Sequence, residues 1–208
     1  LVEGLGTTFT ITIFAALIGI VLGFLVAIIR STADKTGKLK ILDAICKAYL
    51  TIIRGTPAMI QLLIMFYVVF VSSNNKVFVA VMTFGINSGA YVAEIVRSGI
   101  MSVDNGQMEA GRSLGFNYTQ TMWYVIMPQA FKNVLPALVN EFIVLLKETS
   151  ICGYIGLMDL TRGGDIIRSR TYEAFFPLIA VAIIYLVIVM LLTAFVNRLE
   201  RRLRASER

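Results

Sequence analysis

Carboxylates placed inside apolar segments are the side chains of this sequence with the clearest capacity for chemistry. Glu141 lies in the run VNEFIVLL and has no lysine or arginine within four positions on either side. An ionised carboxylate removed from water is costly unless a cation compensates its charge. The ammonium or guanidinium group of a ligand could supply that cation, and so could an arginine of the protein. We therefore take Glu141 and its neighbour Asn140 as candidate contacts for the cationic part of a ligand.

A second set of polar side chains recurs at helical spacing in another apolar segment. Asn87, Tyr91 and Glu94 follow one another at intervals of four and three residues, so one face of a helix would carry all three. If this helix begins near Val77, Asn87 lies ~15 Å in, near the middle of a bilayer core. Arg97 follows Glu94 by three positions, so an intrahelical ion pair is the alternative to a ligand contact for Glu94. We expect this face to assist Glu141 in binding a substrate.

Several kinds of site are excluded or disfavoured by what the sequence lacks. It contains no histidine, which rules out histidine-based catalytic triads and histidine metal sites. Its two cysteines, Cys46 and Cys152, have no metal-type spacing and are expected to be buried as small hydrophobic residues. The phosphate-binding pattern GxxxxGK[ST] does not occur, so this chain is not expected to bind ATP. We predict no catalytic residue, no metal site and no cofactor in this chain.

The composition is that of a membrane protein. Hydrophobic residues make up 57% of the 208 residues and charged residues only 15%, whereas soluble domains carry about 25% charge. So little charge cannot cover a water-exposed surface, and we predict one all-α integral membrane domain over residues 1–208, surrounded by lipid. The net charge of +6 then reflects basic cytoplasmic segments and not nucleic-acid binding. The sequence begins with Leu1 and not Met, and we expect an N-terminal piece to precede it.

Mostly apolar runs predict five transmembrane helices, since about 20 apolar residues cross a bilayer. The fourth run is the most polar, and it suits a span whose polar face is turned toward protein. Gly55-Thr56-Pro57 is expected to break or kink the second span. The segment between the fourth and fifth spans is predicted to be an outer loop of mixed charge. The predicted spans cover residues 5–30, 42–71, 77–100, 129–149 and 174–197.

Lysine and arginine are distributed unevenly between the two sides of this topology. With the N-terminus outside, 14 basic residues, Lys38 and Arg208 among them, lie in or beside cytoplasmic segments, and 5 lie outside. The positive-inside rule favours this orientation over its inverse. The sequence therefore predicts that residues 31–40, residues 101–128 and the tail after Asn197 face the cytoplasm.

The long cytoplasmic connection over residues 101–128 has a pattern of its own. Gly106 and Gly115 divide it into two short helices. Ala110 and Gly111 belong to a small-residue surface on which side chains of another protein could close. An amphipathic helix lying on the membrane is the alternative that the residue pattern leaves open.

This connection resembles a known motif. The sequence EAGRSLG, followed by nine residues and VIMP, is similar to the EAA loop of permease subunits in ATP-binding-cassette (ABC) importers. It departs from that motif by small or apolar replacements at Gly111, Val125 and Met127. The segments RGTP, SGAYVAEIVRSGI, MPQAFKNVLPALVNEF and LLKETS extend the resemblance over nearly the whole chain. They narrow it to the polar amino-acid permeases of the histidine, glutamine and arginine uptake type.

The resemblance implies a multi-pass permease subunit in the inner (plasma) membrane of a prokaryote. Separate ABC ATPase subunits would bind ATP and Mg²⁺, and Glu109, Ala110, Gly111 and Gly115 would form coupling helices seated in an ATPase groove. A second permease is implied, with a homodimer favoured and a heterodimer possible. An extracytoplasmic solute-binding protein would deliver the amino-acid substrate. The two intramembrane carboxylates favour a basic substrate, arginine first.

Two other functions are left open by the residues. An ion-gradient-driven secondary transporter or channel subunit would also be apolar, but such proteins commonly contain internal repeats or more spans. A membrane-embedded hydrolase is disfavoured by the lack of histidine. Dependence of uptake on ATP hydrolysis by a separate subunit distinguishes an importer from both alternatives.

Overall fold

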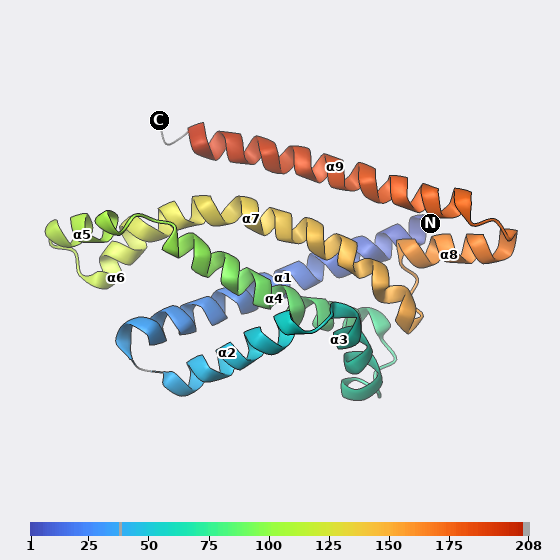
Figure 1. Cartoon of the computed structure of the whole chain (residues 1–208), viewed down its shortest axis with the longest axis horizontal. Helices are drawn as coiled ribbons and strands as arrows, with labels where there is room; N and C mark the ends of the chain where they lie inside the picture. The colour runs from blue at the N-terminus through green and yellow to red at the C-terminus, as the bar shows by residue number, and fades with distance from the viewer. Residues whose placement is uncertain (38, 206–208) are drawn as a thin grey trace.

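Helices account for all regular structure in the residues that the computed structural model describes, which are 1–37 and 39–205 (Figure 1). This confirms the predicted all-helical class. Lys38 and residues 206–208, which the charge distribution assigned to the cytoplasm, lie outside the described residues. The α-helices are α1 (Val2–Thr36), α2 (Lys40–Gly55), α3 (Ala58–Ile64), α4 (Lys76–Met101), α5 (Asn105–Ser113), α6 (Tyr118–Thr121), α7 (Met127–Glu148), α8 (Leu160–Thr171) and α9 (Phe175–Ala205). Met65–Val69 and Met122–Ile126 are π-helical, and Thr149–Ile155 is a 3₁₀ helix.

α1 and α4 pack against each other and form the centre of the fold (Figure 1). Glycines permit this close approach. A Cβ atom added at Gly23 would lie 2.5 Å from Cγ1 of Val92, and one at Gly85 would lie 2.8 Å from Cγ2 of Ile18. Close backbone contact between membrane helices supplies the packing energy that a hydrophobic driving force cannot supply within lipid. Buried residues of this centre and its neighbours include Ile11, Ala15, Leu62, Ala80 and Phe84.

The predicted second span is broken, as the sequence Gly55-Thr56-Pro57 indicated. α2 and α3 meet at an angle of 109°, and Pro57 is the N-cap of α3. Such a break leaves carbonyl groups in the last turn of α2 without helical partners. Nε2 of Gln61 donates hydrogen bonds to the carbonyl oxygens of Ile53 at 2.7 Å and of Thr56 at 3.1 Å, and these bonds stabilise the corner.

Three described helices are long and apolar enough to cross a membrane alone, and they cover Val2–Asp34, Lys76–Met101 and Phe175–Arg201. The bent pair Lys40–Gly55 and Ala58–Val69 makes a fourth candidate. α7 was predicted as the fourth span and is not among them, although its 22 residues would extend over ~33 Å. The count of five spans therefore stays a prediction.

The segment 150–173, predicted as an outer loop, contains α8. The side chain of Asp159 caps this helix and accepts hydrogen bonds from the backbone N–H groups of Thr161 and Arg162, each at 3.1 Å. The segment LTRGGDIIRSRT has two adjacent glycines and little apolar periodicity. Its sequence therefore did not indicate a helix.

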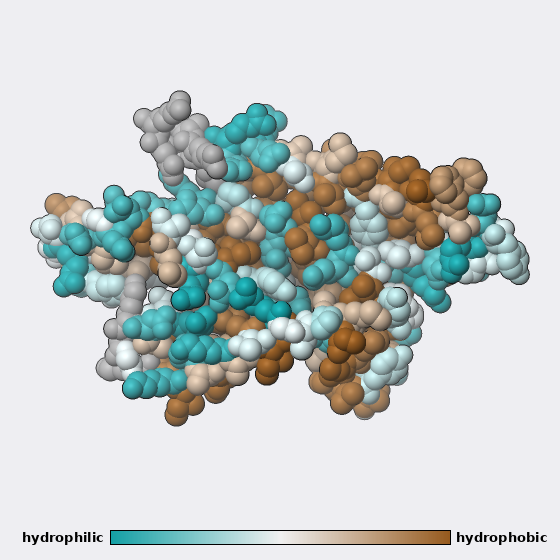
Figure 2. All heavy atoms as spheres, viewed as in Figure 1, coloured by the Kyte–Doolittle hydropathy of each residue, from teal (hydrophilic) through white to brown (hydrophobic). Residues whose placement is uncertain are grey.

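The two ends of the molecule gather different connections (Figure 1). One end carries the turn between α1 and α2, the hairpin of α5 and α6, and the last turns of α9, all of which were predicted to be cytoplasmic. The other end carries the N-terminus and α8, both predicted to lie outside. Apolar side chains cover much of α9, whereas hydrophilic side chains gather across the middle of the face shown in Figure 2. The orientation of the chain in the membrane stays a prediction.

Candidate functional site

A cavity of about 760 Å³ lies between α4 and α7 and extends to α2 and α9. This volume is within the ~300–1,000 Å³ typical of small-molecule sites. Three of the predicted substrate residues, Glu141, Tyr91 and Glu94, lie on its wall. The other two, Asn140 and Asn87, are not among the described residues that line it. The wall is completed by Arg54, Ile95, Ser98, Gly99, Ser102, Lys132, Asn133, Pro136, Ala137 and Glu200.

Glu141 is held by a single hydroxyl group from the neighbouring helix. Oγ of Ser88, on α4, donates a hydrogen bond to Oε1 of Glu141 at 3.0 Å. No side chain that the structure describes forms an ion pair with Glu141. The carboxylate that lacks a basic neighbour in the sequence therefore also lacks an ion-pair partner in the described fold. A carboxylate has about four acceptor positions, so Glu141 can accept further hydrogen bonds from a cationic ligand.

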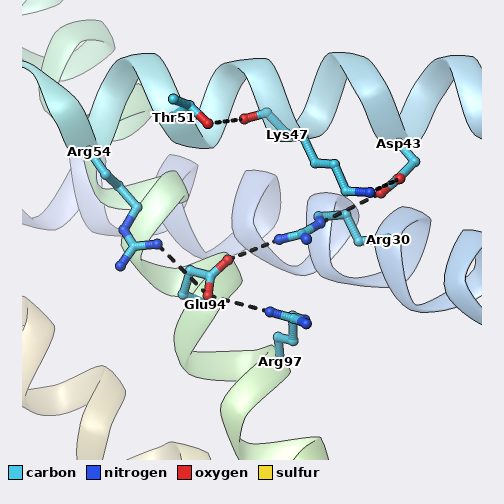
Figure 3. Close-up of polar contacts among 7 residues, drawn as sticks. All are labelled: Arg30, Asp43, Lys47, Thr51, Arg54, Glu94 and Arg97. Atoms are coloured by element: carbon cyan, nitrogen blue, oxygen red, sulfur yellow. Dashed lines mark hydrogen bonds and ion pairs between the residues drawn. The ribbon is translucent and has the colours of Figure 1, made fainter.

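Glu94 is surrounded by arginines from three helices (Figure 3). Its Oε1 lies 3.0 Å from Nη1 of Arg30 on α1, while its Oε2 lies 3.8 Å from Nη1 of Arg54 on α2. Arg97, on α4 itself, also lies 3.8 Å from Oε2. The intrahelical pair with Arg97 that the sequence offered as an alternative is present, and two further partners accompany it. The charge of Glu94 is thus compensated within the chain, although the residue still lines the cavity.

The remaining predicted substrate residues have different surroundings. Asn87 is buried, and its Nδ2 donates a hydrogen bond to Oε1 of Gln61 at 2.9 Å, so it ties α4 to the corner between α2 and α3. Asn140 is exposed on α7. The ring centroid of Tyr91 lies 5.8 Å from Cζ of Arg54, within range of a cation–π contact. The roles of these residues as substrate contacts stay predictions.

Two basic residues of the cavity wall, Arg54 and Lys132, were not predicted to lie there. Both belong to the 14 basic residues that the positive-inside rule assigns to cytoplasmic segments or their flanks. Arg54 stands immediately before Gly55-Thr56-Pro57. Its position before this helix break could have indicated a place on the cavity wall. A helix that ends inside a bundle can direct its last side chains toward the interior.

Residues 101–128 form a short helical hairpin at one end of the molecule (Figure 1). Asp104 caps α5 by accepting a hydrogen bond from the N–H group of Gly106 at 2.6 Å. α6 begins with a capping box in which Asn117 and Gln120 satisfy each other's backbone N–H groups. The two short helices expected in this connection are therefore present.

The predicted coupling residues divide into exposed and internal positions. Glu109 and Ala110 are exposed on α5. Gly111 is buried against α6, where an added Cβ atom would lie 2.4 Å from Cγ2 of Thr121. Gly115 has a φ of +85°, with nothing within 4 Å of an added Cβ. Gly111 thus permits contact between α5 and α6 inside the hairpin. The coupling role of all four residues stays a prediction.

Two hydrogen bonds tie residues 101–128 to α7. Nε2 of Gln129, on α7, donates a hydrogen bond to Oε1 of Gln107, on α5, at 3.2 Å. Nδ2 of Asn133, also on α7, donates to Oγ of Ser102, which directly follows α4, at 2.9 Å. These bonds connect residues 101–128 to the helix that carries Glu141.

Apolar helices long enough to cross a membrane, with a cavity that carries charged side chains between them, are typical of integral membrane transport proteins. A family model for the binding-protein-dependent transport system inner membrane component matches residues 19–205, and the chain belongs to this family. This finding confirms the resemblance stated from the EAA-like loop and the segments around it.

Relatives and solved structures agree with this family. The chain is 38% identical over 206 residues to a putative glutamine transport system permease protein of Rickettsia typhi, covering 98% of this chain and 92% of the relative. It is 36% identical over 210 residues to the arginine transport system permease protein ArtQ of Bacillus subtilis, covering 100% and 94% of the two chains. The solved structure of an amino acid ABC transporter with histidines matches with a TM-score of 0.89 at 43% identity, covering 97% of this chain and 92% of that chain. The MetNI methionine ABC transporter, at 21% identity and a TM-score of 0.80, shares the fold. The chain is an amino-acid permease of the ABC class in a bacterial inner membrane.

Proposed function

We propose that this chain is the permease subunit of an ATP-driven importer for basic amino acids, with arginine as the first candidate substrate. The observation that carries the proposal is Glu141, which lines the cavity and forms no ion pair with a side chain that the structure describes. Relatives named for glutamine and arginine transport, and a related structure with histidines, support a polar amino-acid substrate. The intramembrane carboxylates favour the basic members of that class.

The substrate would bind along the wall between α4 and α7. Glu141 would accept hydrogen bonds from the ammonium or guanidinium group of the amino acid, while Ser88 holds the carboxylate in place. Charge-assisted hydrogen bonds of this kind contribute about 1.5–3 kcal/mol each. Glu94 would contribute less, because three arginines already compensate its charge.

The hairpin of α5 and α6 would couple transport to ATP hydrolysis in a separate ATPase subunit, which would hold ATP and Mg²⁺. Its exposed residues Glu109 and Ala110, with Gly115 at the end of the EAA-like sequence, would seat in the groove of that subunit. The two hydrogen bonds that tie the hairpin to α7 would then transmit movement toward the cavity.

α7 would complete a set of five spans, because Lys132 and Glu141 line the cavity and would not face lipid. A second permease subunit would form the rest of the transport pathway, as a homodimer in the favoured case or as a heterodimer. An extracytoplasmic solute-binding protein would deliver substrate to the end of the molecule that carries α8.

The function is tested by uptake into proteoliposomes that contain the permease, its ATPase subunit and the solute-binding protein. Labelled arginine should accumulate only when ATP is hydrolysed, and a hydrolysis-deficient ATPase is the matched control. Dissipating ion gradients should leave uptake unchanged. Uptake driven by an ion gradient without ATP would contradict the importer assignment. Stronger competition by unlabelled glutamine than by unlabelled arginine would contradict the basic specificity alone.

A further inference from the structure

A second cavity, of about 430 Å³, lies between α1, α2 and α4 and shares Arg54 and Glu94 with the cavity that Glu141 lines, which we call the substrate cavity. Figure 3 shows the charged side chains around the second cavity. Basic side chains dominate its described wall, with Arg30 from α1, Lys47 and Arg54 from α2, and Arg97 from α4. We call this cavity the cationic pocket. Leu50, Thr51, Gly55 and Glu94 complete its described lining.

Two of the four cations are compensated by close carboxylates. Arg30 has a side chain only 12% exposed and lies 3.0 Å from Oε1 of Glu94. Nζ of Lys47 lies 2.6 Å from Oδ2 of Asp43. The ion pair between Arg30 and Asp43 is weaker, because Nε of Arg30 lies 3.6 Å from Oδ1 of Asp43. Neither of these two atoms makes a hydrogen bond to a residue that the structure describes.

The other two cations are only weakly compensated. Arg54 and Arg97 each lie 3.8 Å from Oε2 of Glu94, which is beyond direct hydrogen-bond distance. Their side chains are 44% and 38% exposed. Among the described side chains, four basic groups thus share two carboxylates, which leaves an excess of two positive charges. Such an excess inside a membrane protein favours a bound anion, and guanidinium groups match the geometry of phosphate.

The outer face of α2 beside the pocket is apolar. Ile41, Ile45 and Ile52 are 78%, 60% and 61% exposed, and their spacing places them on one side of the helix. Ala44 and Ala48 lie between this side and the basic side, and both are exposed. A soluble anion would use only the basic side of α2, whereas a phospholipid would use both sides.

We propose that the cationic pocket binds the phosphate of an anionic phospholipid, with its acyl chains along the exposed apolar face of α2. In the predicted orientation the pocket lies toward the cytoplasmic leaflet, where basic pockets between transmembrane helices meet anionic head groups. Arg54 and Glu94 belong to this pocket and also to the wall of the substrate cavity. A bound lipid would therefore stabilise one wall of the substrate cavity, whichever amino acid the permease carries.

The proposal is tested by native mass spectrometry of the purified permease–ATPase complex in neutral detergent. The complex is titrated with phosphatidylglycerol or with phosphatidylcholine, and the lipids retained per permease are counted. The wild-type complex should retain phosphatidylglycerol at roughly tenfold lower concentration than phosphatidylcholine. The double variant Lys47→Gln with Arg97→Gln should lose this preference. Lys40→Gln with Arg198→Gln is the matched control, since it removes two exposed charges outside the pocket.

Three outcomes would overturn the proposal. Equal retention of the two lipids by the wild-type complex would show that the pocket does not select an anionic head group. Equal loss of preference in both double variants would show diffuse attraction and no site. Full displacement of phosphatidylglycerol by an equal concentration of glycerophosphoglycerol, its deacylated head group, would assign the pocket to soluble anions. The comparison of the two lipids and the displacement by glycerophosphoglycerol both use wild-type protein. These two tests can therefore overturn the proposal even if the pocket variant does not assemble with the ATPase.

Discussion

Glu94 and Glu141 line the same cavity, but their charges are compensated in different ways. Glu94 faces three arginines, which link α1, α2 and α4 through one carboxylate. Glu141 has the hydroxyl group of Ser88 and no ion pair among the described side chains. A cationic ligand gains more from a carboxylate that no protein cation neutralises. Glu141 is therefore the stronger candidate for substrate contact, whereas the ion pairs of Glu94 link three helices.

Glu141→Gln keeps the shape of the side chain and removes its charge. We expect the affinity for labelled arginine to fall roughly ten- to a hundredfold, because a charge-assisted hydrogen bond contributes about 1.5–3 kcal/mol and 1.4 kcal/mol is tenfold. The measurement is direct binding to the solubilised permease–ATPase complex without the solute-binding protein. Glu3→Gln, at an exposed position of α1, is the control and should bind as the wild type does. Equal affinity of wild type and Glu141→Gln would reject the site.

The hairpin of α5 and α6 depends on two glycines for different reasons. Gly111 lets the two helices touch, because an added Cβ atom would lie 2.4 Å from Cγ2 of Thr121. Gly115 has a φ of +85°, which side chains of other residues rarely adopt. A bulky residue at Gly115 would strain the backbone as well as obstruct a docking surface. Ala110 is exposed inside α5, so an enlarged side chain there changes the surface alone.

Ala110→Leu should uncouple the ATPase from transport while the permease still folds and inserts. Leucine is a good helix former, and overpacking a docked contact costs about 1–3 kcal/mol, so substrate-stimulated ATP hydrolysis should fall roughly tenfold or more. Substrate-stimulated ATPase activity in proteoliposomes is the measurement. Ala110→Ser should retain activity, and Ala182→Leu, at an exposed position of α9, should have no effect on coupling. Undiminished activity in Ala110→Leu would remove this surface from the ATPase interface.

For the molecule as a whole, the sequence predicted long apolar helices and local breaks better than contacts between helices. α1 and α9 followed from uninterrupted apolar runs, and the corner between α2 and α3 followed from Pro57. Cys46 and Cys152 are buried as predicted, with 7% and 0% exposure. The pairing of Arg30 and Arg54 with Glu94 could not be predicted, because it depends on how α1 and α2 lie against α4. Helix α8 was missed because its two adjacent glycines and its few apolar residues give little helical periodicity.

Labelling of single cysteines tests the orientation and the crossing of α7 together. In a chain carrying Cys46→Ala and Cys152→Ala, an impermeant maleimide applied to intact cells should label Ser72→Cys. It should label Asn197→Cys only after permeabilisation. α4, α7 and α9 separate these two positions, so three crossings place them on opposite sides and two crossings would place them on the same side. Labelling of both in intact cells would show that α7 does not span, and labelling of Asn197→Cys alone would invert the topology.

Helices in contact at glycines have little freedom to slide, because neither backbone leaves room for the other to pass. α1 and α4 should therefore behave as one rigid body during transport. Gly99 brings α4 equally close to α7, because an added Cβ atom there would overlap Cγ2 of Val134, so α7 belongs to the same body. α9 is only 6% buried over its apolar window and is the element left to move. The hydrogen bond from Ser88 to Glu141 lies inside the rigid body and should persist through the cycle, so release of a cationic substrate would have to come from a change elsewhere in the cavity wall.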